Sequence, residues 1–286
     1  MKIITSAKEL QKEVLKYREE KKSIGFVPTM GYLHEGHMSL VHHARKENDL
    51  VIMSVFVNPL QFGPNEDFDS YPRDFERDER LAKNNGVDII FYPQVEEMYK
   101  DTFSFHVKVL NKVNVLCGQK REGHFDGVAT VLIKLFNITQ PNRAYFGMKD
   151  AQQVAIIESI IEDFNFPITL VPVDIVREED GLAKSSRNVY LSDQERNEAP
   201  QLYEALKRAK SLVEQGEYDV RTLQLAVSEH ISKHTSGEID YVEILNYPEL
   251  EPIQVLSGKT IIAVAVKFTK ARLIDNITFD IKHINN

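Results

Sequence analysis

The chain has 286 residues, of which 42% are hydrophobic and 27% are charged. This balance is typical of a soluble globular protein and excludes a mainly disordered chain, which has too little apolar surface to bury. The formal net charge of −8 disfavours a protein that binds nucleic acid through phosphate contacts, because that class carries a basic excess. At roughly 150 residues per domain, the length predicts one large domain or two ordinary ones.

Cysteine content and hydropathy indicate the compartment. Cys117 is the only cysteine, so an internal disulfide is impossible and a cysteine-based metal site is disfavoured. We expect Cys117 to be a small core residue. Residues 1–10 lack the apolar stretch of a signal peptide, and no segment approaches the ~18 apolar residues that cross a bilayer. We therefore expect a cytoplasmic protein.

In the first half of the chain, short apolar runs alternate with amphipathic stretches. The pattern predicts strands at 23–28, 50–57, 87–92, 144–146 and 168–173, and helices at 36–46, 74–84, 127–138 and 150–165. A loop rich in Pro, Asn and Gly covers residues 58–72. Continuous apolar strands that alternate with helices indicate a parallel sheet covered on both faces.

The pattern changes after about Asp174. Helices are predicted at 192–215 and 219–234, and strands at 239–245, 260–268 and 271–278. Helices followed by strands indicate a smaller α+β unit. We therefore predict an α/β protein with a Rossmann-like parallel-sheet domain at 1–174 and a smaller α+β domain at 175–286.

The first polar motif, Pro28–His37, follows a buried strand and precedes a helix, which places His34 and His37 at a helix N-terminus. Unpaired backbone N–H groups there favour an anion, and imidazoles can hydrogen-bond to phosphate oxygens. The spacing fits a helix-capping pair and a phosphate site equally. It does not fit the zinc motif H-E-x-x-H, because the two histidines are three residues apart instead of four.

The second motif, Val57–Asn65, follows the next strand, at the end of a parallel strand where such sheets bind ligands. The amide of Gln61 can donate and accept, so it suits a hydroxyl or a carboxylate. A turn stabilised by Asn and Pro is the simpler explanation of this segment alone.

The third motif, Tyr145–Gln153, again joins a strand to a helix. Lys149 could reach a phosphate as a point charge. Asp150 could cap the helix or bind ribose hydroxyls. Gln153 would lie one turn further along, near the same end of the sheet.

The fourth motif, Leu182–Asn188, sets the hydroxyls of Ser185 and Ser186 between the cations of Lys184 and Arg187. The planar fork of an arginine suits phosphate oxygens, so the segment could clamp a polyphosphate. A solvated basic turn explains this segment alone at least as well.

Two further segments favour structural roles. The charged run Asp74–Arg80 predicts a solvated helix face. The segment Gly123–Val128 opens a helix, with Asp126 as its expected cap and Phe125 packed in the core, although it could also line the site.

The first and fourth motifs together resemble the HxGH and KMSKS signatures of the class I nucleotidyltransferases. The full set resembles the pantothenate synthetase (pantoate–β-alanine ligase) family. The segments that carry this resemblance, in chain order, are 28–37, 56–63, 71–73, 123–127, 146–153 and 184–188.

The resemblance implies a ligase of pantothenate biosynthesis that works in two steps. Pantoate attacks the α-phosphorus of ATP and releases pyrophosphate, and β-alanine then attacks the pantoyl adenylate to give pantothenate and AMP. The substrates would therefore be ATP, pantoate and β-alanine, with Mg²⁺ on the ATP phosphates. The resemblance also implies a homodimer.

The same resemblance implies roles for particular residues. His37 would be the catalytic histidine, with His34, Lys149, Ser185, Ser186 and Arg187 at the phosphates. Gln61 and Gln153 would hold pantoate, and Gln61 would also lie near β-alanine. Residues 1–174 would bind ATP and pantoate. From their position at the domain junction, and not from the resemblance, we expect the loop with Lys184 and the unit 175–286 to act as a moving lid. The other expected ATP contacts are Met30, Gly31, Tyr32, Leu33, Glu35, Gly36, Gly147, Met148, Asp150, Val176 and Lys184.

Three positions depart from residues common in the family, since Lys184, Met148 and Tyr32 stand where Met, Glu and Asn are frequent. None of them removes a group that the mechanism requires, but Lys184 adds a cation near the phosphates.

Two other classes fit part of the pattern. A related nucleotidyltransferase with a phosphate-bearing acceptor would favour cations where Gln61 and Gln153 stand, and an aminoacyl-tRNA synthetase would need a basic RNA-binding domain. A regulatory module that binds nucleotide without catalysis would not need the complete polar set.

Overall fold

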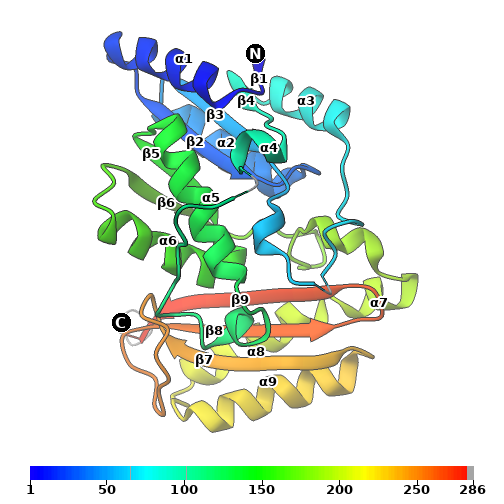
Figure 1. Ribbon diagram of the computed structural model, residues 1–286. Helices are drawn as coiled ribbons and strands as arrows, with labels where there is room; N and C mark the ends of the chain where they lie inside the picture. The colour runs from blue at the N-terminus through cyan, green and yellow to red at the C-terminus, as the bar shows by residue number, and fades with distance from the viewer. Residues whose placement is uncertain (65, 101, 282–286) are drawn as a thin grey trace. The chain divides into compact units, whose positions relative to one another are not determined.

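The computed structural model describes residues 1–64, 66–100 and 102–281 (Figure 1). The chain divides into two compact units. The first contains Met1–Asn111, Lys120–Met148 and Ile156–Asp174. The second contains Lys112–Gln119, Lys149–Ala155 and Ile175–Asn286.

A parallel six-stranded sheet forms the centre of the first unit, with the order β1-β4-β3-β2-β5-β6. Because β2 leads to β3 on one side and β5 leads to β6 on the other, the winding of the sheet reverses between β2 and β5. Open parallel sheets bind ligands at such a switch point, outside the carboxyl ends of the strands. The predicted Rossmann-like sheet is confirmed. The strands are β1 (Lys2–Ile4), β2 (Ile24–Thr29), β3 (Leu50–Val55), β4 (Ile89–Phe91), β5 (Arg143–Gly147) and β6 (Thr169–Val173).

Helices cover both faces of this sheet. On one face, Val27 and Met53 pack with Val41 of α2 and Ala82 of α3. Phe26 alternates to the other face, where its ring meets Phe136 of α5 edge-on at 6.4 Å between centroids. Burial on both faces explains the continuous apolar strands. The helices are α1 (Ala7–Glu19), α2 (Glu35–Glu47), α3 (Phe75–Asn84), α4 (Val95–Met98), α5 (His124–Thr139) and α6 (Ala151–Asp163).

The first strand and helix were not predicted. β1 has only three residues, and α1 buries only Leu10 and Val14. The strands predicted at 50–57 and 87–92 are shorter in the structure, at Leu50–Val55 and Ile89–Phe91.

The second unit is built on an antiparallel sheet in the order β7-β8-β9, formed by Glu238–Asn246, Lys259–Lys267 and Arg272–Asp280. Helices α8 (Gln201–Glu214) and α9 (Val220–His234) bury their apolar faces in one core with this sheet. The predicted α+β architecture of this part of the chain is therefore present. Cys117 groups with this unit and is buried as predicted, with Sγ 3.4 Å from Tyr241 Oη.

The single helix predicted at 192–215 is wrong. The structure has two helices there, α7 (Asp193–Glu198) and α8, and Pro200 lies between them. Proline has no backbone N–H and its ring collides with the preceding helical turn, so a continuous helix through Pro200 is disfavoured.

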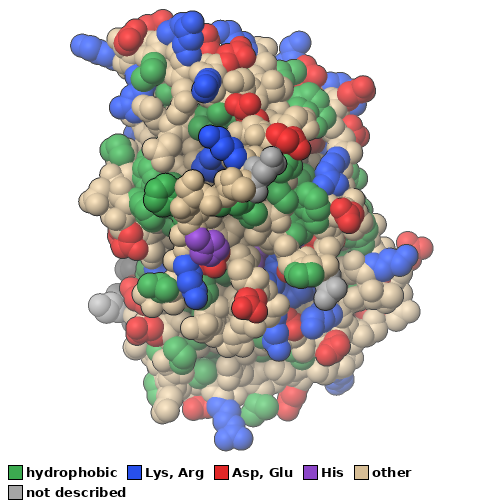
Figure 2. Space-filling view, viewed as in Figure 1, with side chains coloured by type: hydrophobic (Ala, Val, Ile, Leu, Met, Phe, Trp, Pro, Cys, Tyr) green, Lys and Arg blue, Asp and Glu red, His purple; other side chains and the backbone are tan. Residues whose placement is uncertain are grey.

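The surface carries charges of both signs. On the face shown in Figure 2, the side chains of Lys and Arg are interspersed with those of Asp and Glu. Among the described helices, none combines the length and the apolar composition that a bilayer crossing requires.

Helix α7 begins with a reciprocal cap that also joins it to a distant turn. Glu195 accepts the N–H of Ser192 at 2.9 Å and the N–H of Thr269 at 2.8 Å. These hydrogen bonds lower the pKa of Glu195 to about 2. The ionised carboxylate is thus favoured in the folded state.

We expect Glu195→Gln to reduce the acid sensitivity of folding. A lowered pKa contributes stability above the unfolded value near 4.5, and this contribution is lost as the pH falls toward 2. Urea unfolding between pH 7 and pH 2 should give a shallower acid limb for the variant than for the parent. Glu214→Gln, at the exposed end of α8, is the control. Parallel curves for parent and Glu195→Gln would contradict the expectation.

Candidate active site

The two histidines of the first motif cap helix α2. Nδ1 of His34 accepts the N–H of Gly36 at 3.1 Å, and Nδ1 of His37 accepts the N–H of His34 at 3.3 Å. The ring centroids lie 4.1 Å apart. Because a backbone N–H only donates, each neutral ring carries its proton on Nε2. Capping through Nδ1 is therefore compatible with ligand binding through Nε2.

The glycine within H-x-G-H is required by the close approach of the first imidazole. A Cβ on Gly36 would lie 2.8 Å from Cε1 of His34, closer than side-chain carbons tolerate. The cap and the glycine therefore form one structural unit.

A buried carboxylate on α3 holds the turn in front of these histidines. Asp78 accepts the N–H groups of Tyr32 and Leu33, both at 2.7 Å, and its residue is only 1% exposed. Tyr32 has φ of 49°, a left-handed conformation uncommon for a non-glycine residue. Burial raises the pKa of Asp78, although the two N–H groups act in the opposite direction. The prediction of a solvated face at 74–80 is wrong at this residue.

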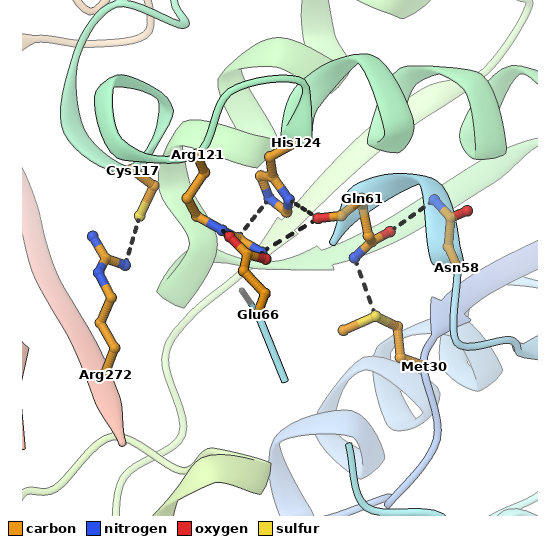
Figure 3. Close-up of polar contacts among 8 residues, drawn as sticks. All are labelled: Met30, Asn58, Gln61, Glu66, Cys117, Arg121, His124 and Arg272. Carbon is orange, nitrogen blue, oxygen red and sulfur yellow. Dashed lines mark hydrogen bonds and ion pairs between the residues drawn. The ribbon is translucent and has the colours of Figure 1, made fainter. Parts of the chain in front are cut away.

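Gln61 ends the short 3₁₀ helix η1 (Pro59–Gln61) that follows β3, and it is buried. Its Oε1 accepts a hydrogen bond from Asn58 at 3.1 Å, and its Nε2 lies 3.1 Å from Sδ of Met30 (Figure 3). The structure therefore brings the second motif against the first. The turn expected from Asn and Pro is also present, since Asn58 caps η1.

The segment 123–128 differs from prediction in one respect. Phe125 is buried as expected, but the N-cap of α5 is Gly123 and no side chain caps it. The carboxylate of Asp126 instead accepts the N–H of Val109 at 2.8 Å. Sequence reasoning missed this bond because its partner lies on a preceding, irregular segment.

The residues of the third motif divide between the two units. Gly147 and Met148 end the part that belongs to the first unit, and Lys149, Asp150 and Gln153 belong to the second. Lys149 Nζ lies 3.9 Å from the carboxylate of Asp150, whose side chain is half exposed.

The fourth motif is an ordered, capped turn. Ser185 caps η4 (Ser186–Tyr190) by accepting the N–H of Arg187 at 3.3 Å. Lys184 donates its N–H to the carbonyl of Val176 at 3.0 Å, and its ammonium lies 2.8 Å from Glu178. The extra cation of Lys184 is thus paired with a carboxylate.

Within the second unit, the third and fourth motifs meet. Lys149 and Ser185 line one small hollow together with Asp275 of β9. Asn276, the next residue, donates its side-chain amide to the carbonyl of Lys149 at 3.0 Å. This strand therefore supports both motifs.

An ion pair that the sequence did not reveal anchors the loop in front of the fourth motif. The guanidinium of Arg177 lies 2.6 and 2.9 Å from the two carboxylate oxygens of Asp275, and it also donates to the carbonyl of Gly181 at 3.0 Å. It stacks on the ring of Tyr203 at 3.5 Å. Burial raises the pKa of Asp275, and the hydrogen bond from Arg177 opposes this shift.

A protein-bound metal ion would need several ligands gathered at one place. In the part of the chain that the structure describes, no group of three or more His, Cys, Asp or Glu side chains is placed to hold one.

A parallel sheet with a histidine-capped helix at its switch point defines a ligand-binding α/β protein of the Rossmann-like class. The family model for pantoate-β-alanine ligase matches residues 2–278. The chain belongs to the pantoate–β-alanine ligase family, and it is a ligase, as the family resemblance implied.

Related sequences agree over their whole length. The chain is 63% identical over 279 residues to pantothenate synthetase of Geobacillus sp. (strain WCH70), covering 98% of this chain and 99% of the relative. It is 60% identical over 282 residues to pantothenate synthetase of Bacillus cereus (strain ATCC 10987), with coverages of 99% and 100%.

Solved structures are similar as well. Pantothenate synthetase from Thermus thermophilus aligns with a TM-score of 0.91 at 45% identity, covering 97% of this chain and 99% of that chain. Pantoate-β-alanine ligase from Francisella tularensis aligns with a TM-score of 0.79 at 33% identity, with coverages of 99% and 98%. That structure is a complex with β-γ ATP and β-alanine.

We expect Asp78→Asn to destabilise the turn before His34. The amide keeps one acceptor oxygen, but its NH₂ group faces the second backbone donor, so one buried N–H loses its partner. The free energy of unfolding should fall by roughly 1–3 kcal/mol. Urea denaturation measures this fall, and Asp74→Asn, at the exposed N-cap of the same helix, is the matched control. Equal stability of parent and Asp78→Asn would contradict the anchoring role.

Proposed function

We propose that this ligase condenses pantoate with β-alanine in an ATP-dependent reaction that passes through a pantoyl adenylate and releases pyrophosphate and AMP. One observation of the structure supports this most directly: two imidazoles cap the N-terminus of α2, beside the switch point of the sheet. Helix N-termini favour anions, so the arrangement suits phosphates.

In the first half-reaction, a carboxylate oxygen of pantoate attacks the α-phosphorus of ATP, and the bond to the oxygen that bridges to the β-phosphorus breaks. Negative charge grows on the leaving pyrophosphate. We assign His37 and His34 to this charge, each donating through Nε2. Such donors act by electrostatic stabilisation and need no covalent intermediate with the protein.

The remaining ATP contacts follow from the family motifs. We assign Lys149, Ser185, Ser186 and Arg187 to the phosphates. Asp150 would bind ribose, and Val176 would contact adenine through its backbone. The other proposed contacts are Met30, Gly31, Tyr32, Leu33, Glu35, Gly36, Gly147, Met148 and Lys184.

We assign pantoate to the side-chain amides of Gln61 and Gln153. An uncharged amide orients a carboxylic acid without neutralising the carboxylate that must attack. In the second half-reaction, the neutral amine of β-alanine, held near Gln61, attacks the acyl carbon of the adenylate. The bond from this carbon to the AMP oxygen breaks, and the amine proton is lost to give pantothenate.

Mg²⁺ would accompany ATP in this reaction. It binds mainly through substrate phosphates and water, so few protein ligands are needed. From the family resemblance we also propose that the enzyme is a cytoplasmic homodimer.

Pyrophosphate release from ATP, Mg²⁺ and pantoate tests this function, measured with and without β-alanine. We expect release that depends on pantoate, with AMP and pantothenate appearing once β-alanine is added. No release with pantoate across a broad pH range would overturn the proposal.

In the same assay, His37→Ala should slow pantoate-dependent pyrophosphate release by roughly 10²–10³-fold, because one donor to the developing charge is lost. The variant should remain folded by circular dichroism. His43→Ala, at an exposed position on the same helix, is the control. Near-normal release by His37→Ala would remove His37 from the catalytic role.

The loop that carries the fourth motif is proposed to close over bound nucleotide, with 175–286 acting as a lid. ATP should then lower the rate of amide hydrogen exchange at Gly181–Asn188, because closure protects its backbone. Exchange is measured with and without ATP, and the buried strand β2 serves as the reference. Unchanged exchange at this loop would contradict closure.

A further inference from the structure

Three ionisable residues of the first unit form a network next to Gln61 that the proposed reaction does not use (Figure 3). Arg121 pairs with Glu66 through two nitrogens, with Nε 2.7 Å from Oε1. Nη1 of Arg121 lies 2.9 Å from Nε2 of His124. Nδ1 of His124 lies 2.7 Å from the backbone carbonyl oxygen of Gln61. The network therefore ends on the backbone of a proposed substrate-binding residue.

The chemistry of its partners fixes the state of His124. A carbonyl oxygen only accepts, so Nδ1 must carry the proton. A guanidinium only donates, so Nε2 must offer its lone pair. His124 is therefore a neutral ring held in one tautomer, and Glu66 in turn holds the guanidinium that selects it.

The first turn of α5 constrains the backbone of η1 at a second point. A Cβ on Gly127 would lie 2.1 Å from the carbonyl oxygen of Leu60, so only glycine allows this approach. The carbonyl of Gly127 also accepts from Asn58 at 3.0 Å, and Asn58 donates to Oε1 of Gln61. The backbone and the side chain of Gln61 are thus both held from the same helical turn.

A partly buried network of charged and polar groups fixes the conformation of this loop at a cost in hydration free energy. His124 is 8% exposed, and the side chains of Arg121 and Glu66 are about one-fifth exposed, at 19% and 23%. Partly buried ionic groups lose hydration, and apolar side chains of similar volume often give equal or greater stability. What they provide is directional bonding, which fixes the carbonyl of Gln61 in one orientation.

We propose that His124, held by Arg121 and Glu66, is a positioning residue that orients Gln61 for the substrate carboxylate, and that it controls pantoate affinity without controlling ATP affinity. This inference rests on the assignment of Gln61 to pantoate made above. His124 acts through Gln61 and touches no reacting atom.

Two variants of His124 separate orientation from packing. His124→Leu removes both hydrogen bonds. His124→Asn keeps an N–H donor the same number of bonds from the backbone as Nδ1, so it can still reach the carbonyl of Gln61. We expect His124→Leu to raise the KM for pantoate roughly tenfold, equivalent to about 1.4 kcal/mol, with the KM for ATP within about twofold. His124→Asn should recover most of this loss, and His43→Asn is the exposed control.

A double-mutant cycle with Gln61→Ala tests whether His124 acts through Gln61. If it does, His124→Leu should cause little further increase in pantoate KM when Gln61 is already alanine. Additive effects, or equal increases in the KM values for pantoate and ATP, would show a general structural role and overturn the inference.

The experiments distinguish an error in the assignment of Gln61 to pantoate from an error in the positioning role of His124. If Gln61→Ala leaves the KM for pantoate unchanged, the assignment of Gln61 is wrong and this inference falls with it. If Gln61→Ala raises that KM and His124→Leu does not, only the inference is wrong. Should His124→Leu fail to fold, Glu66→Gln replaces it in the cycle, with a smaller increase in pantoate KM expected and no change overturning the proposal.

Discussion

Backbone N–H groups in the turn from β2 into α2 need acceptors, and side chains of the motif and of α3 supply several of them. The N–H of Gly31 donates to Thr29 Oγ1 at 3.2 Å, and the next two N–H groups donate to Asp78. The N–H of His34 and that of Gly36 donate to imidazole nitrogens. Because Nδ1 of each ring is committed to the backbone, the proton of each neutral ring is set at Nε2. The same bonds therefore build the turn and fix the tautomer of both neutral histidines.

Directional bonds to backbone groups recur at the other polar segments. The carbonyl of Gln61 is held by His124, and the carbonyl of Gly181 is held by Arg177. In each case the donor residue belongs to a buried or partly buried ion pair or is hydrogen-bonded to one. Such pairs add little net stability when their loss of hydration is counted, but they specify geometry. Loops that must present a side chain at a fixed place benefit from this property more than the apolar core does.

The proposed reaction suits this construction. Attack of a carboxylate on the α-phosphorus, with cleavage of a phosphoanhydride bond, needs few covalent contributions from a protein and many correctly placed donors. Neutral amides and imidazoles on rigid turns can supply such donors without forming ion pairs with the nucleophile. The departures at Tyr32 and Lys184 fit this view, because Tyr32 contributes a backbone N–H to the anchored turn and the charge of Lys184 is paired with Glu178.

Local signals predicted much of the molecule correctly. The apolar runs indicated five of the six strands of the parallel sheet. The motif segments indicated the family and its ligase activity, both confirmed by comparison. Two failures concern helices: Pro200 divides the helix predicted at 192–215, and α1 was not predicted. Asp126 was expected to cap a helix because Asp often does, but its partner is Val109.

Periodicity and the identity of the motif residues can be read from the chain alone, since both depend on neighbouring positions. The polar side chains that support those motifs are known only from the folded molecule. Asp78 reaches Leu33 across 45 positions, His124 reaches Gln61 across 63, and Arg177 reaches Asp275 across 98. Hydrogen bonds and ion pairs over such separations follow no period. They form only because folding brings the two residues of each pair together. Folding also removes the water that would otherwise compete for their polar groups.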